Sequence, residues 1–117
     1  MANTEFIRVG GAIRALIIAG PANPDKTSFL TSDDAVFQAG FIVYPAGGAV
    51  VPHFHKPVRR SVEGTCEAIL VRSGNCHLDL YDDERNLFAT RTLAAGDIVI
   101  LYGGGHGFRM IDDCVLF

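Results

Sequence analysis

Clusters of turn-forming residues interrupt this sequence at short intervals along its whole length. They occupy residues 20–25, 31–34, 45–48, 73–75, 82–86, 94–97 and 103–107. Between them lie short runs rich in Val, Ile, Leu, Phe and Tyr. No run combines helical apolar spacing with an N-terminal cap and a C-terminal stop. The pattern predicts an all-β protein, because Gly, Pro, Asn and Asp favour turns whereas β-branched and aromatic residues favour strands.

The runs between the turns are the expected strands. They span residues 12–19, 28–31, 35–44, 49–55, 67–73, 76–82, 87–93, 97–102, 107–111 and 114–117. The clearest expected pairing is a hairpin over residues 67–84, since the Ser-Gly-Asn turn in its middle tolerates a positive φ. Short strands at this spacing are typical of a β-sandwich or a β-barrel.

Length and charge narrow the class of protein. At 117 residues the chain suits one compact domain, so we expect a single domain over residues 1–117. The net charge of -3 provides no positive field for a polyanion, and we therefore expect no nucleic-acid partner. The apolar run 12–20 contains Arg14 and is too short to cross a membrane, so no membrane partner is expected.

The number of cysteines and the apolar content predict the cellular compartment and the assembly of the protein. The three cysteines, Cys66, Cys76 and Cys114, are odd in number and lack a CxxC spacing, which argues against a disulfide framework or a zinc ribbon. We expect a cytoplasmic protein in which all three are buried as small apolar side chains. Hydrophobic residues make up 49% of the chain, which leaves apolar surface for a homodimer contact.

Histidines and a glutamate are the candidate chemical groups. On a strand over 49–55, His53 and His55 would point to one face about 6.5–7 Å apart, with Phe54 on the other face. Two such imidazoles can bind one metal ion. Alternation also places Glu67 and His106 each on an otherwise apolar face, where a polar group needs a partner.

The spacing of these residues resembles the first motif of the cupins, a family of small β-proteins. That motif is Gly, five residues, HxH, three or four residues, Glu, six residues and Gly. Here five residues separate Gly47 from His53, and six separate Glu67 from Gly74.

The middle of this motif departs from the family. Eleven residues separate His55 from Glu67, which makes Glu63 an alternative carboxylate. We prefer Glu67, because its spacing to Gly74 places it at the start of the next strand.

A second cupin motif follows in the expected order. Its pattern is Gly, five residues, Pro, one residue, Gly, two residues and His. Residues 96–106 supply Gly96, then Tyr102 where Pro is usual, and His106 after one residue fewer than usual. Three glycines before His106 let the backbone turn sharply and direct the imidazole inward. The core motifs thus lie within residues 40–111.

The resemblance implies a double-stranded β-helix, or jelly-roll barrel. It also implies a divalent transition metal, Fe, Mn, Ni, Zn or Cu, bound by His53, His55, Glu67 and His106. An open site of this kind supports Lewis-acid polarisation or oxygen activation. The chain is similar to a group of small cupins whose genes often lie near surface-polysaccharide genes, which implies carbohydrate-related chemistry.

The expected function is therefore that of a metal-dependent enzyme acting on a small sugar-derived or carboxylate substrate. Isomerisation, epimerisation and dioxygenation all stay open, and no general base is identified. The alternatives are a non-catalytic module that binds a small ligand and a structural cupin without metal.

Four further residues are candidates for substrate binding. Lys56, Arg59 and Arg60 form a basic cluster, and guanidinium groups bind carboxylate or phosphate bidentately. Tyr102 would lie at the mouth of the barrel as a hydrogen-bond donor. Alternatively, the basic cluster is part of a solvated loop, and Tyr102 has a packing role.

Overall fold

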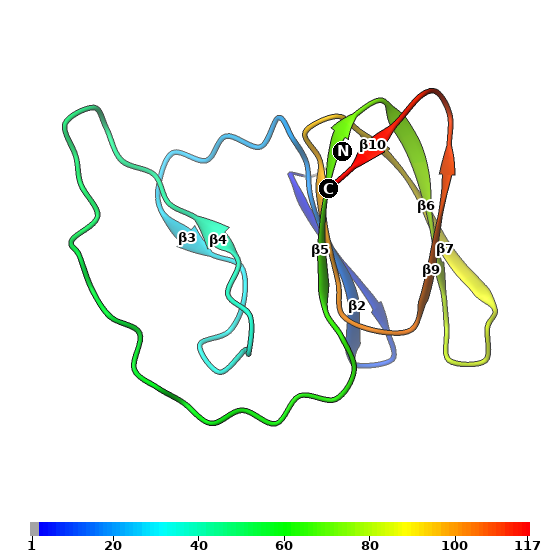
Figure 1. The fold of residues 1–117 in the computed structure, drawn as a ribbon, viewed down its shortest axis with the longest axis horizontal. Coiled ribbons are helices and arrows are strands. Elements are labelled where there is room, and N and C mark those ends of the chain that lie inside the picture. Colours follow the sequence, from blue (N-terminus) through cyan, green and yellow to red (C-terminus); the bar gives the residue numbers. More distant parts are fainter. Residues whose placement is uncertain (1–2) are drawn as a thin grey trace. The chain divides into compact units, whose positions relative to one another are not determined.

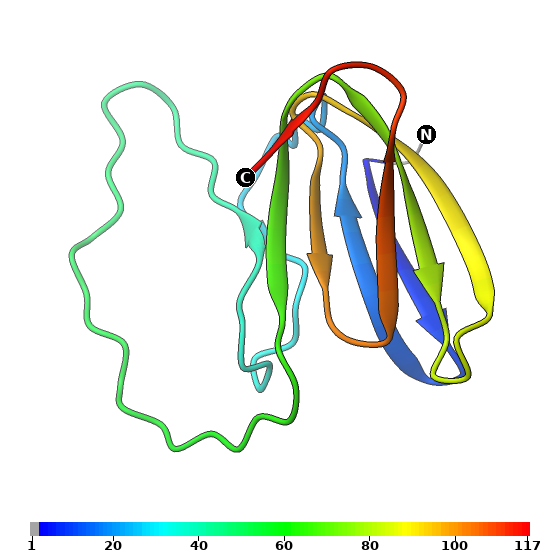
Figure 2. The same cartoon turned by 45° about the vertical axis from the view of Figure 1, so that its right-hand side comes forward.

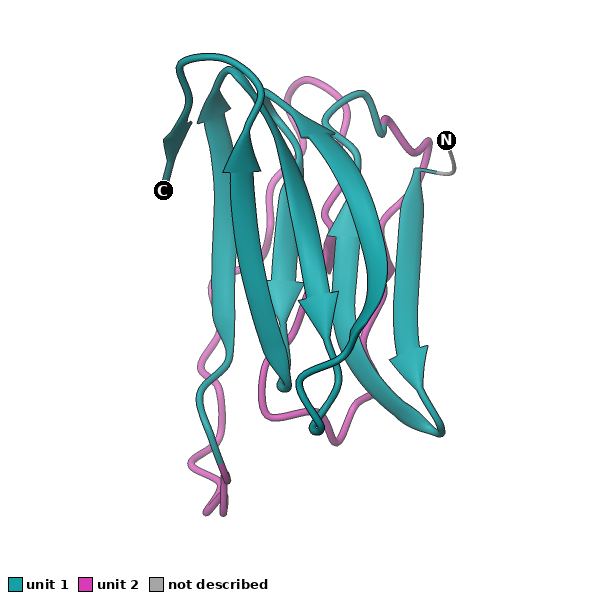
Figure 3. Cartoon of the chain, turned by 90° about the vertical axis from the view of Figure 1, so that its right-hand side faces the viewer, with its two compact units in different colours: residues 1–22, 64–117 teal, residues 23–63 magenta. Residues whose placement is uncertain are grey.

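The computed structural model describes residues 3–117, which form ten β-strands and no helix. The all-β prediction is confirmed. No helix of the described part of the chain is long and apolar enough to span a membrane. The chain divides into two compact units, shown in different colours in Figure 3: unit 1 comprises residues 1–22 and 64–117, and unit 2 comprises residues 23–63.

Unit 1 contains two antiparallel sheets that face each other (Figures 1 and 2). The five-stranded sheet has the order β1-β2-β8-β5-β10, with bounds Thr4–Val9, Ala12–Ile18, Ile98–Leu101, Glu67–Ser73 and Val115–Leu116. The three-stranded sheet has the order β7-β6-β9, with bounds Leu87–Ala94, Asn75–Tyr81 and Gly105–Met110. None of these sheets closes into a barrel within the described residues, and the arrangement is compatible with a β-sandwich.

The core of unit 1 lies between the two sheets. Successive side chains of a strand point to opposite faces, so alternate apolar residues from each sheet meet in the middle. The five-stranded sheet contributes Ile7, Ala15, Ile17, Val71, Val99 and Leu101, and the three-stranded sheet contributes Cys76, Leu78, Leu80 and Leu93. The core is thus built from the strands that the sequence predicts, together with β1.

The hairpin expected over residues 67–84 does not form. β5 pairs with β8 and β10, whereas β6 pairs with β7 and β9. At Gly74, where φ is +82°, the chain instead crosses from one sheet to the other. The Asp112 carboxylate stabilises this crossing by accepting hydrogen bonds from the Asn75 backbone N–H at 2.6 Å and from its side-chain amide at 2.8 Å.

Strand β1 was not among the expected strands. It pairs with β2 through a tight turn in which Gly10 has a φ of +57°. The alternation in residues 4–9 followed by Gly-Gly is a hairpin signal that could have identified it. A bidentate ion pair then links the edge strands of the two sheets, since Arg91 Nε and Nη2 on β7 lie 2.8 and 2.9 Å from the Glu5 carboxylate oxygens on β1.

Unit 2 contains much less strand than expected. Its strands are β3 (Ser28–Phe29) and β4 (Gly40–Phe41), which pair antiparallel. The expected strand 35–44 is reduced to β4, and the expected strand 49–55 is wrong, because residues 42–66 form no strand. Three prolines in this segment, Pro45, Pro52 and Pro57, lack the N–H that a sheet ladder requires.

The cysteines differ in burial. Cys76 is buried, as predicted, whereas Cys66 and Cys114 are half-buried, so the expectation that all three are buried is corrected. The pKa of the Cys76 thiol is raised to about 11, mainly because the thiol is buried and next because Cys114 lies nearby. A thiol with so high a pKa is a poor nucleophile at neutral pH.

Candidate functional site

Glu67 and His106 come together at one end of the interior of unit 1. Glu67 begins β5 opposite Leu101, and His106 lies on β9 opposite Leu80. Both leucines belong to the buried core, and residues directly opposite on paired strands share a face. The two polar side chains therefore point inward from facing sheets, and Glu67 Oε1 lies 3.5 Å from His106 Nε2.

This pair is accessible to a ligand. The Glu67 and His106 side chains are 50% and 30% exposed, so they lie at an open end of the sandwich rather than inside its core. The His106 ring is fixed by an edge-to-face contact with Phe108, at 6.0 Å between centroids. Two donors about 2.1 Å from one tetrahedral ion lie about 3.4 Å apart, so the observed separation of the two atoms suits two ligands of one metal.

Arg14 lies at the same end and was missed as a functional candidate. It occupies an irregularity in the β1–β2 register, and such bulges redirect a side chain. Its Nη2 lies 3.0 Å from Asp83 Oδ2, and its carbonyl accepts a hydrogen bond from the Tyr102 backbone N–H. The signal in the sequence was an arginine inside the apolar run 12–20.

His53 and His55 form a second pair of donors, in unit 2. Although they lie on no strand, their ring centroids are 5.2 Å apart. The Val51 carbonyl can only accept a hydrogen bond, so the 2.8 Å contact assigns the proton to His53 Nδ1. This leaves the lone pair of Nε2 available for a metal ion or a proton.

The four predicted metal ligands thus lie as two pairs, one in each unit. Glu67 and His106 belong to unit 1, and His53 and His55 belong to unit 2. Over residues 3–117, neither unit by itself contains three His, Cys, Asp or Glu side chains grouped to hold an ion. Glu63, the alternative carboxylate, is an exposed residue of unit 2.

The four predicted substrate-binding residues have different surroundings. Lys56, Arg59 and Arg60 are exposed in unit 2, and Arg60 Nη1 donates a hydrogen bond to the Asp34 carbonyl at 2.8 Å. Tyr102 is half-buried in unit 1, where burial and then the Cys66 thiol raise the pKa of its hydroxyl. Tyr102 therefore stays protonated at neutral pH and is able to donate a hydrogen bond.

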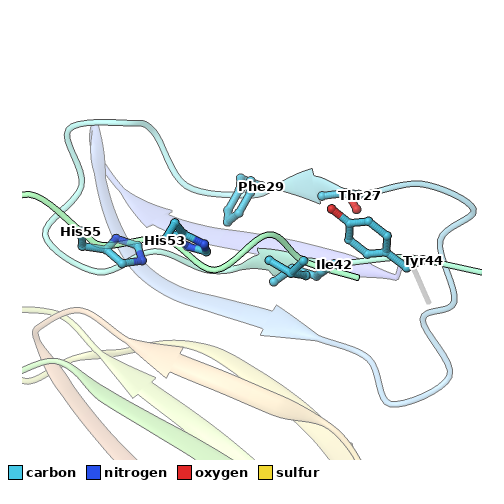
Figure 4. A pocket seen from close by; sticks show the side chains of 7 residues that line it. Thr27, Phe29, Ile42, Tyr44, His53 and His55 are labelled. Carbon is cyan, nitrogen blue, oxygen red and sulfur yellow. The ribbon is translucent and has the colours of Figure 1, made fainter. Parts of the chain in front are cut away.

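Unit 2 also contains a pocket of about 280 Å³ beside the two histidines (Figure 4). It is lined by Thr27, Phe29, Ile42, Tyr44, Val50, His53 and His55. Thr27 Oγ1 accepts a hydrogen bond from the Val43 N–H at 2.9 Å and donates one to its carbonyl at 3.2 Å, which holds the wall of the pocket together. No sequence pattern predicts this pocket, because its lining residues come from separate segments.

A polar network covers part of the outer face of the three-stranded sheet. Asp79 on β6 accepts hydrogen bonds from Arg109 Nε at 2.6 Å, from Arg109 Nη2 at 3.0 Å and from the Thr90 hydroxyl at 2.7 Å. These hydrogen bonds lower the pKa of the Asp79 carboxyl from 3.8 to about 2, and those from Arg109 have a larger effect than the one from Thr90. The network favours the ionised form of Asp79 in the folded protein.

A dependence of stability on pH follows from this shift. Because the folded pKa is depressed, we expect the contribution of Asp79 to be present above about pH 4 and to be lost as the pH falls toward about 2. Asp79→Asn should lower the free energy of unfolding at pH 7 and flatten its slope between pH 4 and 2. Urea unfolding across this range measures both. Asp113→Asn, at an exposed residue, should leave the slope unchanged, and an equal slope in Asp79→Asn and the wild type would contradict the prediction.

Each unit therefore has its own candidate pair of metal-binding side chains: an inward-facing Glu–His pair in unit 1, and a His–His pair beside a pocket in unit 2. These donors are the types that bind first-row transition metals. No protein-family model, curated protein or solved structure matches this chain.

Proposed function

We propose that this protein is a metal-binding protein with a cupin-like jelly-roll fold, in which His53, His55, Glu67 and His106 bind one divalent transition metal ion. The observation that carries the proposal is the approach of Glu67 Oε1 to within 3.5 Å of His106 Nε2 from facing sheets. The adjacent rings of His53 and His55, with one Nε2 left free by a backbone hydrogen bond, add support.

The strand order of unit 1 supports the fold assignment. After β5 the chain crosses to the other sheet for β6 and β7, returns for β8, crosses again for β9 and returns for β10. Repeated crossing between two facing antiparallel sheets is typical of jelly rolls. The motif glycines Gly74 and Gly96, with φ of +82° and +95°, lie at two of these crossings.

An ion held by this ligand set would supply Lewis-acid polarisation or oxygen activation. We propose a cytoplasmic enzyme that acts on a small sugar-derived or carboxylate substrate, with Lys56, Arg59 and Arg60 balancing the negative charge of the substrate. Isomerisation, epimerisation and dioxygenation are the candidate reactions. The proposal includes a homodimer, supported by the exposure of Phe54 (99%) and Val51 (76%).

Metal content tests the proposal directly. We expect protein purified without chelator to carry Fe, Mn, Ni, Zn or Cu in an equimolar ratio, measured by elemental analysis. Single replacement of His53 or His106 by alanine should weaken Zn²⁺ binding at least about tenfold, and the double variant should bind none. His77→Ala is the matched control, because His77 hydrogen-bonds Thr92 instead. Metal-free wild-type protein, with no change in either variant, would defeat the proposal.

The carboxylate ligand is identified by a pair of matched variants. Glu67→Gln should weaken Zn²⁺ binding, whereas Glu63→Gln should not, and the reverse result would assign the ligand to Glu63. Turnover of sugar phosphates, nucleotide sugars or small carboxylates by the metal-loaded protein would distinguish an enzyme from a non-catalytic binding module.

A further inference from the structure

The pocket in unit 2 has a distinctive chemical layout. Phe29 and Ile42 supply an apolar middle, and these side chains are 60% and 62% exposed. Figure 4 shows the imidazoles of His53 and His55 toward one end and the hydroxyl of Tyr44, beside Thr27, toward the other. The pocket is therefore an exposed apolar surface with hydrogen-bonding groups at both ends.

The size of the pocket limits its occupant. At about 280 Å³ it lies just below the usual range for small-molecule sites, so it suits a compact molecule rather than a nucleotide sugar. An apolar group that binds here would remove the large apolar side chains lining the pocket from water, and this burial favours binding. Sugar hydroxyl groups that face Phe29 and Ile42 in this pocket would lose their hydrogen bonds to water, whereas an aromatic ring has no such groups to desolvate.

We propose that the substrate is a small carboxylate with an apolar body, such as an aromatic ring, rather than a sugar derivative. The ring lies between Phe29 and Ile42, and the carboxylate points toward His53 and His55. This inference rests on the proposed function for the metal ion at the histidines, but the ring contacts are independent of it. It narrows the substrate class to one of the two that the sequence left open.

Two probes of equal charge test the inference. Phenylacetate and glucuronate are both monocarboxylates, and they differ in the polarity of their bodies. We expect phenylacetate to bind the Zn²⁺-loaded full-length protein at least about tenfold more tightly than glucuronate, as measured by calorimetry. Equal or tighter binding of glucuronate would overturn the inference.

Matched variants locate the binding site. Ile42→Asn should weaken phenylacetate binding about tenfold and leave glucuronate unaffected. Val58→Asn changes a side chain of similar exposure, 61%, outside the pocket and should change neither affinity. Unchanged phenylacetate binding in Ile42→Asn would refute the assignment. Both residues are exposed, so both variants should fold, which circular dichroism verifies.

The same experiment separates this inference from the proposed function. If the protein binds no metal, yet phenylacetate still binds and Ile42→Asn weakens it, the pocket stands and the metal proposal fails. If metal binds but the two probes bind equally, only the pocket assignment fails. Light scattering identifies a competing occupant: a dimer that Ile42→Asn converts to a monomer, with no phenylacetate binding, would show that a second copy covers this surface.

Discussion

Replacement of Gly74 by alanine is expected to lower the free energy of unfolding by more than about 3 kcal/mol. A Cβ atom at this position would overlap the carbonyl oxygen of Asp113 and lie 2.8 Å from both Asp112 Oδ1 and the Cα of Cys114. The φ of +82° adds backbone strain of about 1–2 kcal/mol for any L-residue with a side chain. The contacted atoms are mainly backbone, so the overlap cannot be relieved by a rotamer change.

Urea unfolding monitored by circular dichroism measures this loss. Gly10→Ala is the matched control, because Gly10 also has a positive φ, +57°, but no atom lies within 4 Å of its added Cβ. The control should therefore lose only the strain, about 1 kcal/mol. Equal losses in the two variants would show that the close packing at Gly74 does not matter.

Asp97→Ala is expected to cost about 2–5 kcal/mol of unfolding free energy. The Asp97 side chain connects two segments of unit 1, because Oδ1 accepts a hydrogen bond from the Gly20 N–H at 2.7 Å and Oδ2 accepts one from the Ala94 N–H at 2.8 Å. Asp97 is 3% exposed, and its removal loses both hydrogen bonds to a buried carboxylate. A hydrogen bond to a charged group contributes about 1.5–3 kcal/mol, and less where water can replace the lost acceptor.

The same unfolding measurement distinguishes the two hydrogen bonds. Asp97→Asn keeps one acceptor oxygen and should lose about half as much stability as the alanine variant. Glu84→Ala, at an exposed residue of the β6–β7 turn, should change stability little. A loss below about 1 kcal/mol in Asp97→Ala would contradict the structural role assigned to this carboxylate.

Gly74 and Asp97 both lie at crossings between the two sheets, close to motif glycines. Gly74 lies where the chain leaves the five-stranded sheet, and Asp97, next to Gly96, lies where it returns. A Cβ on Gly20 would lie 2.9 Å from the backbone carbon of Gly96, so the backbones approach closely here as well. Two of the motif glycines, Gly74 and Gly96, therefore have a local physical reason, which is sharp crossing between sheets.

Only part of the geometry around the candidate residues can be predicted from the sequence. Alternation of side chains along a strand predicts that Glu67 and His106 lie on apolar faces, because this depends on neighbours two residues apart. Their 3.5 Å approach depends on which strands face each other, and no local pattern encodes that. Asp97 and Arg14 were not predicted as important, since their partners lie 77 and 69 residues away.

The sequence by itself determined the fold class and, for the predicted strands that form, the face on which each side chain lies. Turn residues and alternation are local properties, and the all-β structure follows from them. Tertiary structure decided the pairing: β5 and β6 adjoin in sequence but lie in different sheets, because each pairs where its apolar face is buried and its backbone hydrogen bonds are satisfied. The absence of a strand in residues 42–66, despite their Val and Ile content, has a local reason instead, since prolines there remove donors that a sheet requires.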